Sequence, residues 1–393
     1  MSYAVLPLLS LLTLGHASEE LLNEQEGYLP YEEAMLESVD EAFTYTLAEA
    51  DEEMEYAANG HTSQEAYQDA KFGSAQPILS EGIGFYFSGD YLFWKAEEDG
   101  LHYGLQSENF GVNQPFPQSN PFKGVFGKPQ GFASKYHSGY RVSLGTLLPR
   151  DEWELFLTWT DYTSSTHSSI DFKSNKAVFP YWIDEHFFPV AQSAAARWNL
   201  HFNTLDFDLG RNLFIGKHLT VRPFFGFQGA WIEQKLQVKY FNMSFVFPTI
   251  PAFNVSSHNR NIYQGYGMRL GVDGRWFLGS GLHLIGSISG SLLYGKFKFS
   301  HFAKTLPSNP RAKLKNHKQL VTPQLFMFGG VGWETQFHTS RVWLNLHIGW
   351  EEQIWLHQNQ FQRYVDAYSE AKTISEEGNL TLQGLTAGAT LGF

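Results

Sequence analysis

Apolar and polar residues alternate with a period of two along many segments of this chain. At the carboxyl end, Leu385, Ala387, Ala389, Leu391 and Phe393 lie on one face of such a segment, and small or polar residues lie on the other. This alternation predicts β-strands with one apolar face. From residue 82 onward it predicts ten strands, over residues 82–96, 132–148, 152–164, 195–210, 218–234, 262–278, 282–298, 320–337, 342–357 and 380–393.

One of these segments changes phase. In residues 195–210, the apolar residues occupy even positions up to Phe202 and odd positions from Leu205 onward. A β-bulge inserts one extra residue into a strand and exchanges its two faces. The change therefore predicts a bulge near Asn203 and Thr204.

The connections between the predicted strands alternate between long and short without exception. In chain order they hold about 35, 3, 30, 7, 27, 3, 21, 4 and 22 residues, and the short ones contain turn-forming residues. Long loops at one end and tight turns at the other are typical of bacterial outer-membrane barrels, whereas a soluble sandwich has no reason to keep its long loops at one end. We therefore predict an all-β fold, a transmembrane antiparallel up-and-down β-barrel of about ten strands with both termini in the periplasm.

The composition agrees with a wall that faces lipid. Aromatic residues make up 16% of the 393 residues and charged residues only 17%, against a usual charged share of about 25%. No run of 18 apolar residues occurs outside the extreme amino terminus, which excludes transmembrane helices. A barrel needs no such run, because only alternate residues face lipid. Cysteine is absent, so disulfides and thiolate metal sites are excluded.

Large aromatic residues fall mostly near the predicted strand ends, where the interfacial girdles of a membrane protein lie. The residues that predict these girdles are Tyr86, Tyr91, Trp94, Trp153, Trp159, Trp198, Trp231, Trp276, Trp333, Trp350 and Trp355.

The first 76 residues differ from the rest. An apolar stretch followed by small residues predicts a secretory signal peptide over residues 1–18. Residues 19–75 hold 16 Asp and Glu and one Lys, whereas the rest of the chain carries about +3, which marks a segment boundary near Gln76. We interpret residues 19–76 as an acidic periplasmic extension with an amphipathic helix, which is either solvated or docked on a periplasmic partner or the barrel mouth, and residues 77–393 as the barrel.

Several segments of the predicted barrel resemble the Legionella-type and chlamydia-like major outer membrane protein family, a set of pore-forming outer-membrane barrels. The resemblance rests on the segments 89–101 (GDYLFWKAEEDGL), 222–226 (RPFFG), 349–355 (GWEEQIW) and 384–393 (GLTAGATLGF). It implies a porin. The acidic extension and the absence of cysteine depart from the cross-linked, cysteine-rich proteins of true chlamydiae, so a disulfide-stabilised coat is not implied.

The predicted strands place charged residues on the face opposite the apolar one, which points into the lumen. An Arg or Lys on the lipid face would cost about 2–4 kcal/mol at the midplane, so the inward phase is strongly favoured. These candidate pore-lining residues are Asp90, Arg141, Arg197, Asp206, Asp208, Arg222, Arg269, Asp273, Arg275, Glu334 and Glu351.

These five arginines and six carboxylates allow two interpretations. In a channel they set ion selectivity, and their near balance predicts weak selectivity. In a narrow barrel they form an ion-pair network that plugs the lumen. Ten strands leave both interpretations open by geometry, and the family resemblance favours a narrow pore.

No catalytic, nucleotide-binding or metal-binding motif occurs, and we expect neither an enzyme nor a cofactor. A minor alternative is a protease at the outer rim, because ten-stranded omptin-type proteases place Asp and His groups there. Its candidate residues are Asp161, Asp184, Glu185 and His186.

The sequence thus predicts a porin of the bacterial outer membrane that allows passive diffusion of small hydrophilic solutes and ions. The alternative is a structural or adhesive barrel with a closed lumen that acts through its surface loops. The partners we expect are outer-membrane lipid, lipopolysaccharide and the barrel-assembly machinery, which would read the terminal strand with Phe393 as its signal. No nucleic-acid partner is expected. The oligomeric state stays open, with a homo-oligomer of the porin type as one alternative.

Overall fold

The computed structural model describes residues 84–111, 127–148, 153–171, 176–183, 190–216, 218–243, 252–306, 309–337, 342–364 and 373–393. The predicted signal peptide and the predicted acidic extension with its helix lie outside these residues. Strands make up the regular structure of the described part. No helix in that part is long and apolar enough to cross a membrane.

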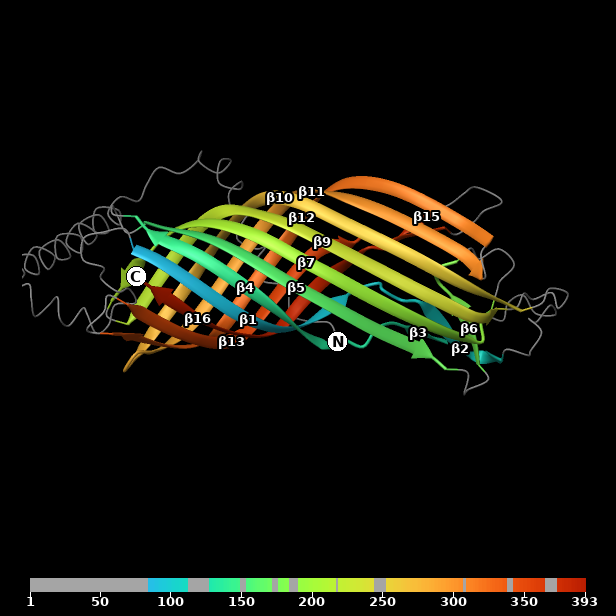
Figure 1. Ribbon diagram of the computed structural model, residues 1–393, viewed down its shortest axis with the longest axis horizontal. Helices are drawn as coiled ribbons and strands as arrows, with labels where there is room; N and C mark the ends of the chain where they lie inside the picture. Colours follow the sequence, from blue (N-terminus) through green and yellow to red (C-terminus); the bar gives the residue numbers. More distant parts are fainter. Residues whose placement is uncertain are drawn as a thin grey trace, which may run out of the picture. The chain divides into compact units, whose positions relative to one another are not determined.

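Ten antiparallel strands form a closed β-barrel, in which each long strand pairs with its neighbours along the chain and the last pairs with the first (Figure 1). The strands are β1 (Gly84–Glu98), β4 (Tyr136–Leu147), β5 (Trp153–Ile170), β7 (Ser193–Arg211), β9 (Leu219–Met243), β10 (Phe253–Gly279), β11 (Leu282–Leu306), β12 (Asn309–Gln336), β13 (Trp343–Asn359) and β16 (Gly378–Gly392). The ten predicted strands and the barrel are confirmed.

Backbone hydrogen bonds close the barrel at the carboxyl terminus. The Phe393 amide donates to the Phe85 carbonyl at 2.9 Å, and the Phe85 amide donates to the Phe393 carbonyl at 3.3 Å. Closure removes both sheet edges, which satisfies the backbone groups that lipid cannot. The start of β1 and the end of β16 therefore lie side by side at one end of the barrel.

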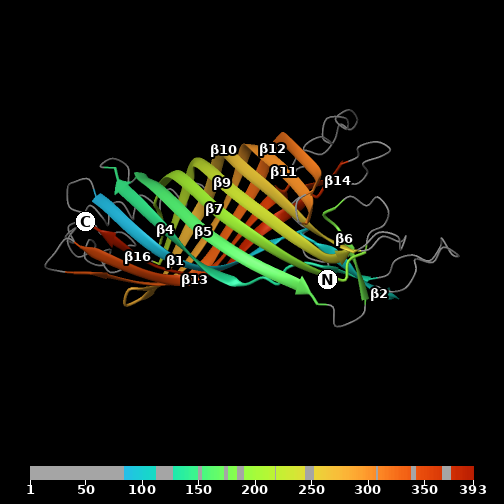
Figure 2. The same ribbon diagram turned by 45° about the vertical axis from the view of Figure 1, so that its right-hand side comes forward.

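The two ends of the barrel differ in their connections, and we name them the turn end and the loop end. At the turn end, β10 and β11 are joined by Ser280 and Gly281, which have φ of 54° and 79°. This left-handed backbone suits a tight hairpin turn. Short strands lie at the loop end (Figure 2). One small sheet consists of β2 (Gly104–Gly111), β3 (Gly127–Gln130) and β6 (Lys176–Pro180), and a hairpin consists of β14 (Gln362–Tyr364) and β15 (Thr373–Ser375). At the turn end, β8 (Leu213–Ile215) pairs with β9.

Two of the predicted long loops are mainly strand. The segment 299–319 contains the end of β11 and the start of β12, and the segment 235–261 contains the end of β9 and the start of β10. These strands continue beyond the apolar part of the wall, as the long arrows of β9 to β12 in Figure 1 show.

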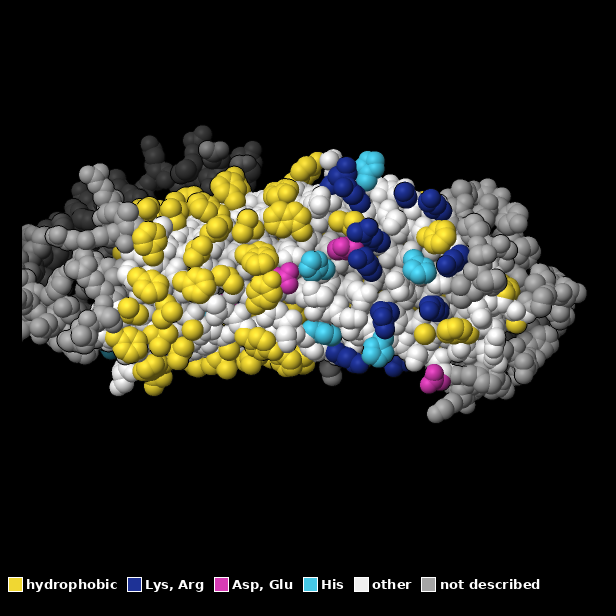
Figure 3. Space-filling model, in the orientation of Figure 1, with side chains coloured by type: hydrophobic (Ala, Val, Ile, Leu, Met, Phe, Trp, Pro, Cys, Tyr) yellow, Lys and Arg dark blue, Asp and Glu magenta, His cyan; other side chains and the backbone are white. Residues whose placement is uncertain are grey.

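Apolar side chains cover the outer wall of the half that adjoins the turn end (yellow in Figure 3). We call them the apolar belt and this half the belt half. On β11 the belt runs from Leu282 to Tyr294. The twelve steps between these two residues, at about 3.3 Å each and tilted by about 40°, span about 30 Å, which matches a hydrocarbon core. The belt consists of Phe85, Phe87, Tyr91, Phe93, Tyr140, Leu144, Leu157, Trp159, Leu205, Phe207, Phe225, Phe227, Tyr266, Met268, Leu270, Trp276, Leu278, Leu282, Leu284, Ile288, Leu292, Tyr294, Val321, Leu325, Met327, Val331, Trp333, Leu346, Ile348, Trp350, Leu385 and Phe393.

Beyond the belt, in what we call the loop half, the polarity of the wall inverts. On β7 the residues from Trp198 to Phe202 are buried inside the barrel at even positions, while Leu205 and Phe207 face outward at odd positions in the belt half. The pairing of β7 with both neighbours is regular throughout. The predicted bulge near Asn203 and Thr204 is therefore wrong. The phase change has another cause: in the loop half the outer wall meets water and the interior is a packed core.

Candidate functional site

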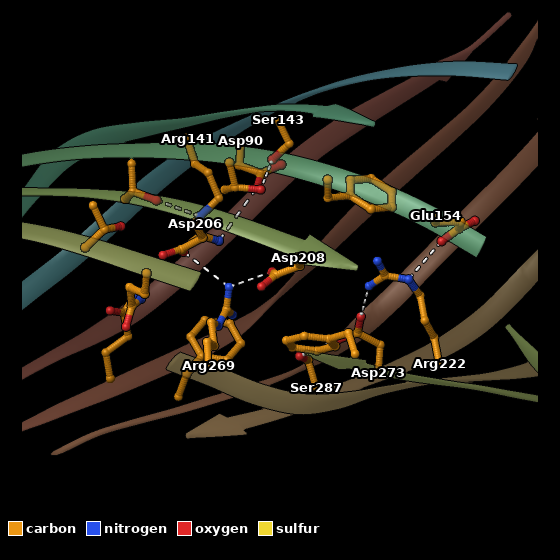
Figure 4. Close-up of a pocket in the computed structure, with 18 of the residues that line it drawn as sticks. Asp90, Arg141, Ser143, Glu154, Asp206, Asp208, Arg222, Arg269, Asp273 and Ser287 are labelled. Carbon is orange, nitrogen blue, oxygen red and sulfur yellow. Dashed lines mark hydrogen bonds and ion pairs between the residues drawn. The ribbon is translucent and has the colours of Figure 1, made fainter. Parts of the chain in front are cut away.

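A cavity of about 270 Å³ lies inside the belt half of the barrel, and charged and polar side chains line it (Figure 4). Nine of the ten barrel strands contribute to its lining. In each strand the alternation that puts apolar residues in the belt puts these residues inside. Three arginines of the lining, Arg141, Arg269 and Arg222, each form ion pairs across the cavity.

Arg141 on β4 forms the most buried ion pair of the cavity. Its Nη2 lies 2.6 Å from Glu351 Oε1 and its Nη1 lies 3.0 Å from Glu351 Oε2, a bidentate arrangement. Glu351, which is 1% exposed, also accepts hydrogen bonds from Thr386 and Gln353, both at 2.9 Å. A buried carboxylate is tolerated when its lone pairs are filled in this way. Asp90, at 3.7 Å from Arg141 Nη1, is the second anion at this arginine.

Arg269 on β10 bridges two carboxylates of β7. Its Nη1 lies 2.8 Å from Asp208 Oδ2 and 3.2 Å from Asp206 Oδ2 (Figure 4). Its Nε and Nη2 donate to Ser289. The guanidinium also lies 5.2 Å from the centre of the Phe224 ring. The aromatic face and the two anions hold Arg269 in a fixed position across the lumen.

Arg222 on β9 joins two further anions near the turn end. Its Nε lies 2.8 Å from Glu154 Oε2 and its Nη1 lies 2.9 Å from Asp273 Oδ2 (Figure 4). Ser287 donates to the other oxygen of Asp273 at 2.6 Å. The guanidinium also lies 4.7 Å from the centre of the Phe156 ring. The three arginines therefore link strands around the lumen rather than along one wall.

The structure places ten of the eleven candidate lumen charges on the inner face of the belt half. Eight of them belong to the ion-pair network of Arg141, Arg222 and Arg269, and Arg275 also lines the cavity. Glu334 lies on the inner face of β12, since its neighbour Trp333 faces outward.

Arg197 is the exception, and its predicted inward position is wrong. It is exposed on the outer wall of β7 in the loop half. Because β7 alternates without a bulge, Arg197 shares the outward face with Leu205 and Phe207, but it lies beyond the belt, where water solvates it.

Two inward groups were missed by the sequence analysis. Glu154, 6% exposed, belongs to the polar face of its strand but was not selected. His347 Nε2 lies 3.3 Å from Asp90 Oδ1, a contact between strands that alternation cannot reveal.

Among the described residues, the inner face of the belt half holds four arginines and seven carboxylates. Negative charges therefore outnumber positive ones, and the predicted near balance of charge is wrong. The arginines are Arg141, Arg222, Arg269 and Arg275, and the carboxylates are Asp90, Glu154, Asp206, Asp208, Asp273, Glu334 and Glu351.

Buried apolar side chains fill the interior of the loop half. We call this cluster the loop-half core. Eight of the ten barrel strands contribute to it, and two side chains from the connections, Trp182 and Phe361, pack into it at 5.9 Å between ring centres. Its largest barrel members are Trp94, Tyr162, Trp198, Phe202, Tyr240, Tyr263, Phe297 and Trp355. Along β7 it extends from Phe202 to Ala194, which corresponds to about 20 Å of depth.

Three tryptophans of this core were predicted in the interfacial girdles, and that prediction is wrong. Trp94, Trp198 and Trp355 are at most 2% exposed and point inward. Each indole N–H has an internal partner: Trp94 donates to Thr386 at 3.1 Å and Trp198 donates to Gln234 at 3.2 Å, while Trp355 donates to Gln353 at 3.4 Å. Thr386 and Gln353, the partners of Trp94 and Trp355, also donate to Glu351. The loop-half core is therefore in direct contact with the charged network of the belt half.

A seam of buried polar side chains accompanies the core on the β10, β12 and β13 side. Gln324 lines the cavity, and Asn261 and Gln358 lie further toward the loop end, where the Asn261 amide donates to the Gln358 carbonyl at 3.1 Å. Gln324 Oε1, Asn261 Oδ1 and both side-chain amide atoms of Gln358 have no partner among the described residues. Buried polar atoms of this kind commonly bind water.

Comparison with known families identifies the chain. The model of the family described as Legionella pneumophila major outer membrane protein precursor matches residues 80–393. The chain belongs to this family. The family match covers the whole barrel, and with the fold it assigns the protein to the bacterial outer membrane. The predicted resemblance is confirmed at the level of the family.

Several solved structures resemble the chain at low sequence identity. The outer membrane protease OmpT from Escherichia coli has a TM-score of 0.36 at 8% identity and covers 80% of this chain and 99% of its own. A major outer membrane protein from Thermus thermophilus has a TM-score of 0.27 at 11% identity, with 80% and 100% covered. A Pseudomonas aeruginosa FadL homologue has a TM-score of 0.26 at 6% identity, with 81% and 91% covered. Scores this low carry no argument about activity. No curated protein matches the chain.

The remaining candidate residues have the following places. Of the rim-protease candidates, Asp184, Glu185 and His186 lie outside the described residues. Asp161 faces outward, and its Oδ2 lies 3.4 Å from His201 Nε2 on the outer wall. Within the described ranges, no group of three or more metal-ligating side chains comes together. Phe393 is 55% exposed at the turn end.

Proposed function

We propose that this protein is a structural outer-membrane barrel with a closed lumen, which presents its loop half and loops at the cell surface. The observation that supports this proposal best is the loop-half core. Side chains such as Phe202, Tyr162 and Trp355, each 0% exposed, fill about 20 Å of the interior. Protein interiors packed in this way exclude water and solutes.

The orientation is part of this proposal. Outer-membrane barrels have short turns on the periplasmic side and long loops outside. By that rule the turn end, with both ends of the barrel sheet, faces the periplasm and the loop half stands outside. The polar outer wall of the loop half supports this orientation, since it would be solvated beyond the bilayer.

The charged network supports a structural role in the belt half. Arg141, Arg222 and Arg269 each join carboxylates on other strands, so they tie the wall together across the lumen. Pairs with little solvent exposure are expensive to break because the remaining charge stays buried. The network therefore stabilises one closed arrangement of the belt half.

A porin is the second candidate, and two observations favour it. The cavity carries a negative excess, and the polar seam of Gln324, Asn261 and Gln358 leads from it toward the loop end with unpartnered atoms. A water-filled seam would form a narrow path. Such a path would prefer cations because of the excess carboxylates, and Arg269→Glu would strengthen that preference, measured as a shift in reversal potential.

Solute uptake by liposomes separates the two candidates. The refolded protein is reconstituted, folding is verified by heat-modifiable gel mobility, and entry of small neutral sugars is followed by swelling. The closed barrel predicts swelling at the rate of protein-free liposomes. Swelling that falls with increasing sugar size would establish a porin and refute the closed lumen.

A further inference from the structure

Basic side chains gather on the outer wall beyond the apolar belt, over β7, β9, β10, β11 and β12 (dark blue in Figure 3). On these strands the outward positions beyond the belt carry a single carboxylate among the described residues, Glu233. It pairs with Lys235 at 2.9 Å and with Arg260 at 2.6 Å. The remaining outward cations have no ion pair with a described carboxylate, and we call them the basic collar: Arg197, Lys239, Lys296, Lys298, Lys304, Lys313 and Lys315.

The collar brings like charges close together. Lys239 and Lys304 both flank Ser256 in the sheet, on opposite sides, which separates their backbones by about 10 Å. His258 lies on the same outward face, and its pKa is lowered by burial and by these two lysines. Lys296 and Lys298 are two residues apart on one face, as are Lys313 and Lys315. Uncompensated cations at such spacing repel one another, and a bound anion would relieve that repulsion.

The lower edge of the collar lies at the height of the head-group layer, and the rest of the collar extends further out from the bilayer. Tyr294 is the last belt residue of β11, and Lys296 and Lys298 are the next two outward positions. With about 3.3 Å per residue and a tilt of about 40°, they stand about 5 and 10 Å above the ring of Tyr294. Head groups extend about 5–8 Å beyond the hydrocarbon core on each side. Lys296 therefore lies at the depth of the lipid phosphates, and Lys298 lies just above that depth.

The collar covers only one side of the barrel. On the other side the outward positions just beyond the belt hold Glu352 on β13 and Gln383 on β16, and on β1 Lys95 is paired with Glu97 at 2.8 Å. Positive charge spread for solubility alone would not be confined in this way. One-sided charge indicates a ligand that approaches from the lipid on that side.

We propose that the basic collar binds the phosphate groups of lipopolysaccharide in the outer leaflet. The inference rests on the proposed orientation, with the loop half outside. Lysine ammonium groups bind phosphate as point charges, and several of them along one wall fit a ligand with more than one phosphate. They would replace the divalent cations that otherwise neutralise neighbouring phosphates, so binding should persist in a chelator.

The test uses the full chain refolded in a nonionic detergent and bisphosphorylated lipid A as the probe, in the presence of a chelator. The collar variant combines Lys296→Gln, Lys298→Gln, Lys313→Gln and Lys315→Gln. The control variant removes the same charge away from the collar, by Lys95→Gln, Lys128→Gln, Lys135→Gln and Arg211→Gln. Heat-modifiable gel mobility verifies that each variant is folded.

The collar variant should bind lipid A at least about tenfold more weakly, because each cation near an anionic surface contributes about a fivefold factor. The control variant should bind as the unsubstituted protein does, and dephosphorylated lipid A should bind the unsubstituted protein as weakly as lipid A binds the collar variant. Equal losses in both variants, or equal affinity for both lipids, would overturn the proposal. Stronger binding of dextran sulfate than of lipid A would also overturn it, since the collar would then serve a soluble polyanion. Liposome swelling of the collar variant separately reports the state of the lumen.

Discussion

Replacing Glu351 with Gln should destabilise the barrel strongly, because it leaves Arg141 buried with only one anion. Glu351 is 1% exposed and lies 2.6 Å from Arg141, whereas Asp90 lies at 3.7 Å. At an effective dielectric constant of about 20, the first contact corresponds to about 6 kcal/mol of Coulomb energy and the second to about 4 kcal/mol. Asp90 thus compensates in part, and the expected net cost is about 3–5 kcal/mol, as for other buried pairs that lose one partner.

The assay is urea unfolding of the reconstituted protein, followed by the fluorescence of its eleven tryptophans. One of them is Trp94, whose ring centre lies 5.5 Å from the Arg141 guanidinium. The exposed pair of Lys95 and Glu97, with side chains 25% and 42% exposed, supplies the matched control. Glu97→Gln should cost at most about 1 kcal/mol. The double variant Arg141→Met with Glu351→Leu should regain part of the loss, since Asp90 then keeps only His347 and Ser88 as partners. A cost below about 1 kcal/mol for Glu351→Gln, or a double variant no more stable than the single one, would refute the reasoning.

Three further predictions concern the loop half and the turn end. Burial lowers the pKa of His301 to about 4, so the neutral form is favoured on folding. The free energy of unfolding should therefore be constant above pH 6.5 and decrease toward pH 4, with a loss of about 2 kcal/mol at pH 5. His301→Gln should flatten this pH dependence, measured by urea unfolding. An unchanged slope in the variant would contradict the prediction. Gly295→Val should lower the free energy of unfolding by about 1–3 kcal/mol, because a Cβ at this position would collide with the Tyr263 ring. The additional change Tyr263→Ala should remove the collision. Equal stability of Gly295→Val and the unsubstituted protein would refute this packing. We propose Phe393 as part of the signal that the barrel-assembly machinery reads, so Phe393→Ala should reduce the folded fraction in cells while the refolded variant keeps its melting temperature. Normal folded levels in cells would contradict this proposal.

The alternation of residues was sufficient to predict the ten strands and the position of the turns. In the belt half, the lipid outside and the charged lumen inside demand opposite residue types, so Asp206, Asp208 and Arg269 could be placed correctly. Alternation shows which residues share a face, and it does not show which face is outside once the environment changes. That is why Arg197 and the inward tryptophans were misplaced, and why the change after Phe202 resembled a bulge.

The contacts across the lumen could not be predicted from the sequence. Arg141 and Glu351 are 210 residues apart, and their pairing depends on barrel closure and on the register of strands that meet only in the folded protein. The closed interior of the loop half was likewise hidden. Apolar residues at inward positions such as Phe297 and Trp355 have the same period as lipid-facing ones, and only the extent of the strands beyond the belt distinguishes them.

Single-channel recording in a planar bilayer tests the closed lumen most directly. The refolded protein, with insertion verified by its heat-modifiable mobility, is added to the bilayer in concentrated salt, a condition chosen to reveal even a narrow path. A barrel whose loop half is filled by Phe202, Tyr162, Trp355 and their neighbours predicts a current indistinguishable from that of the bare bilayer. Steady conductance steps from the unsubstituted protein would contradict it.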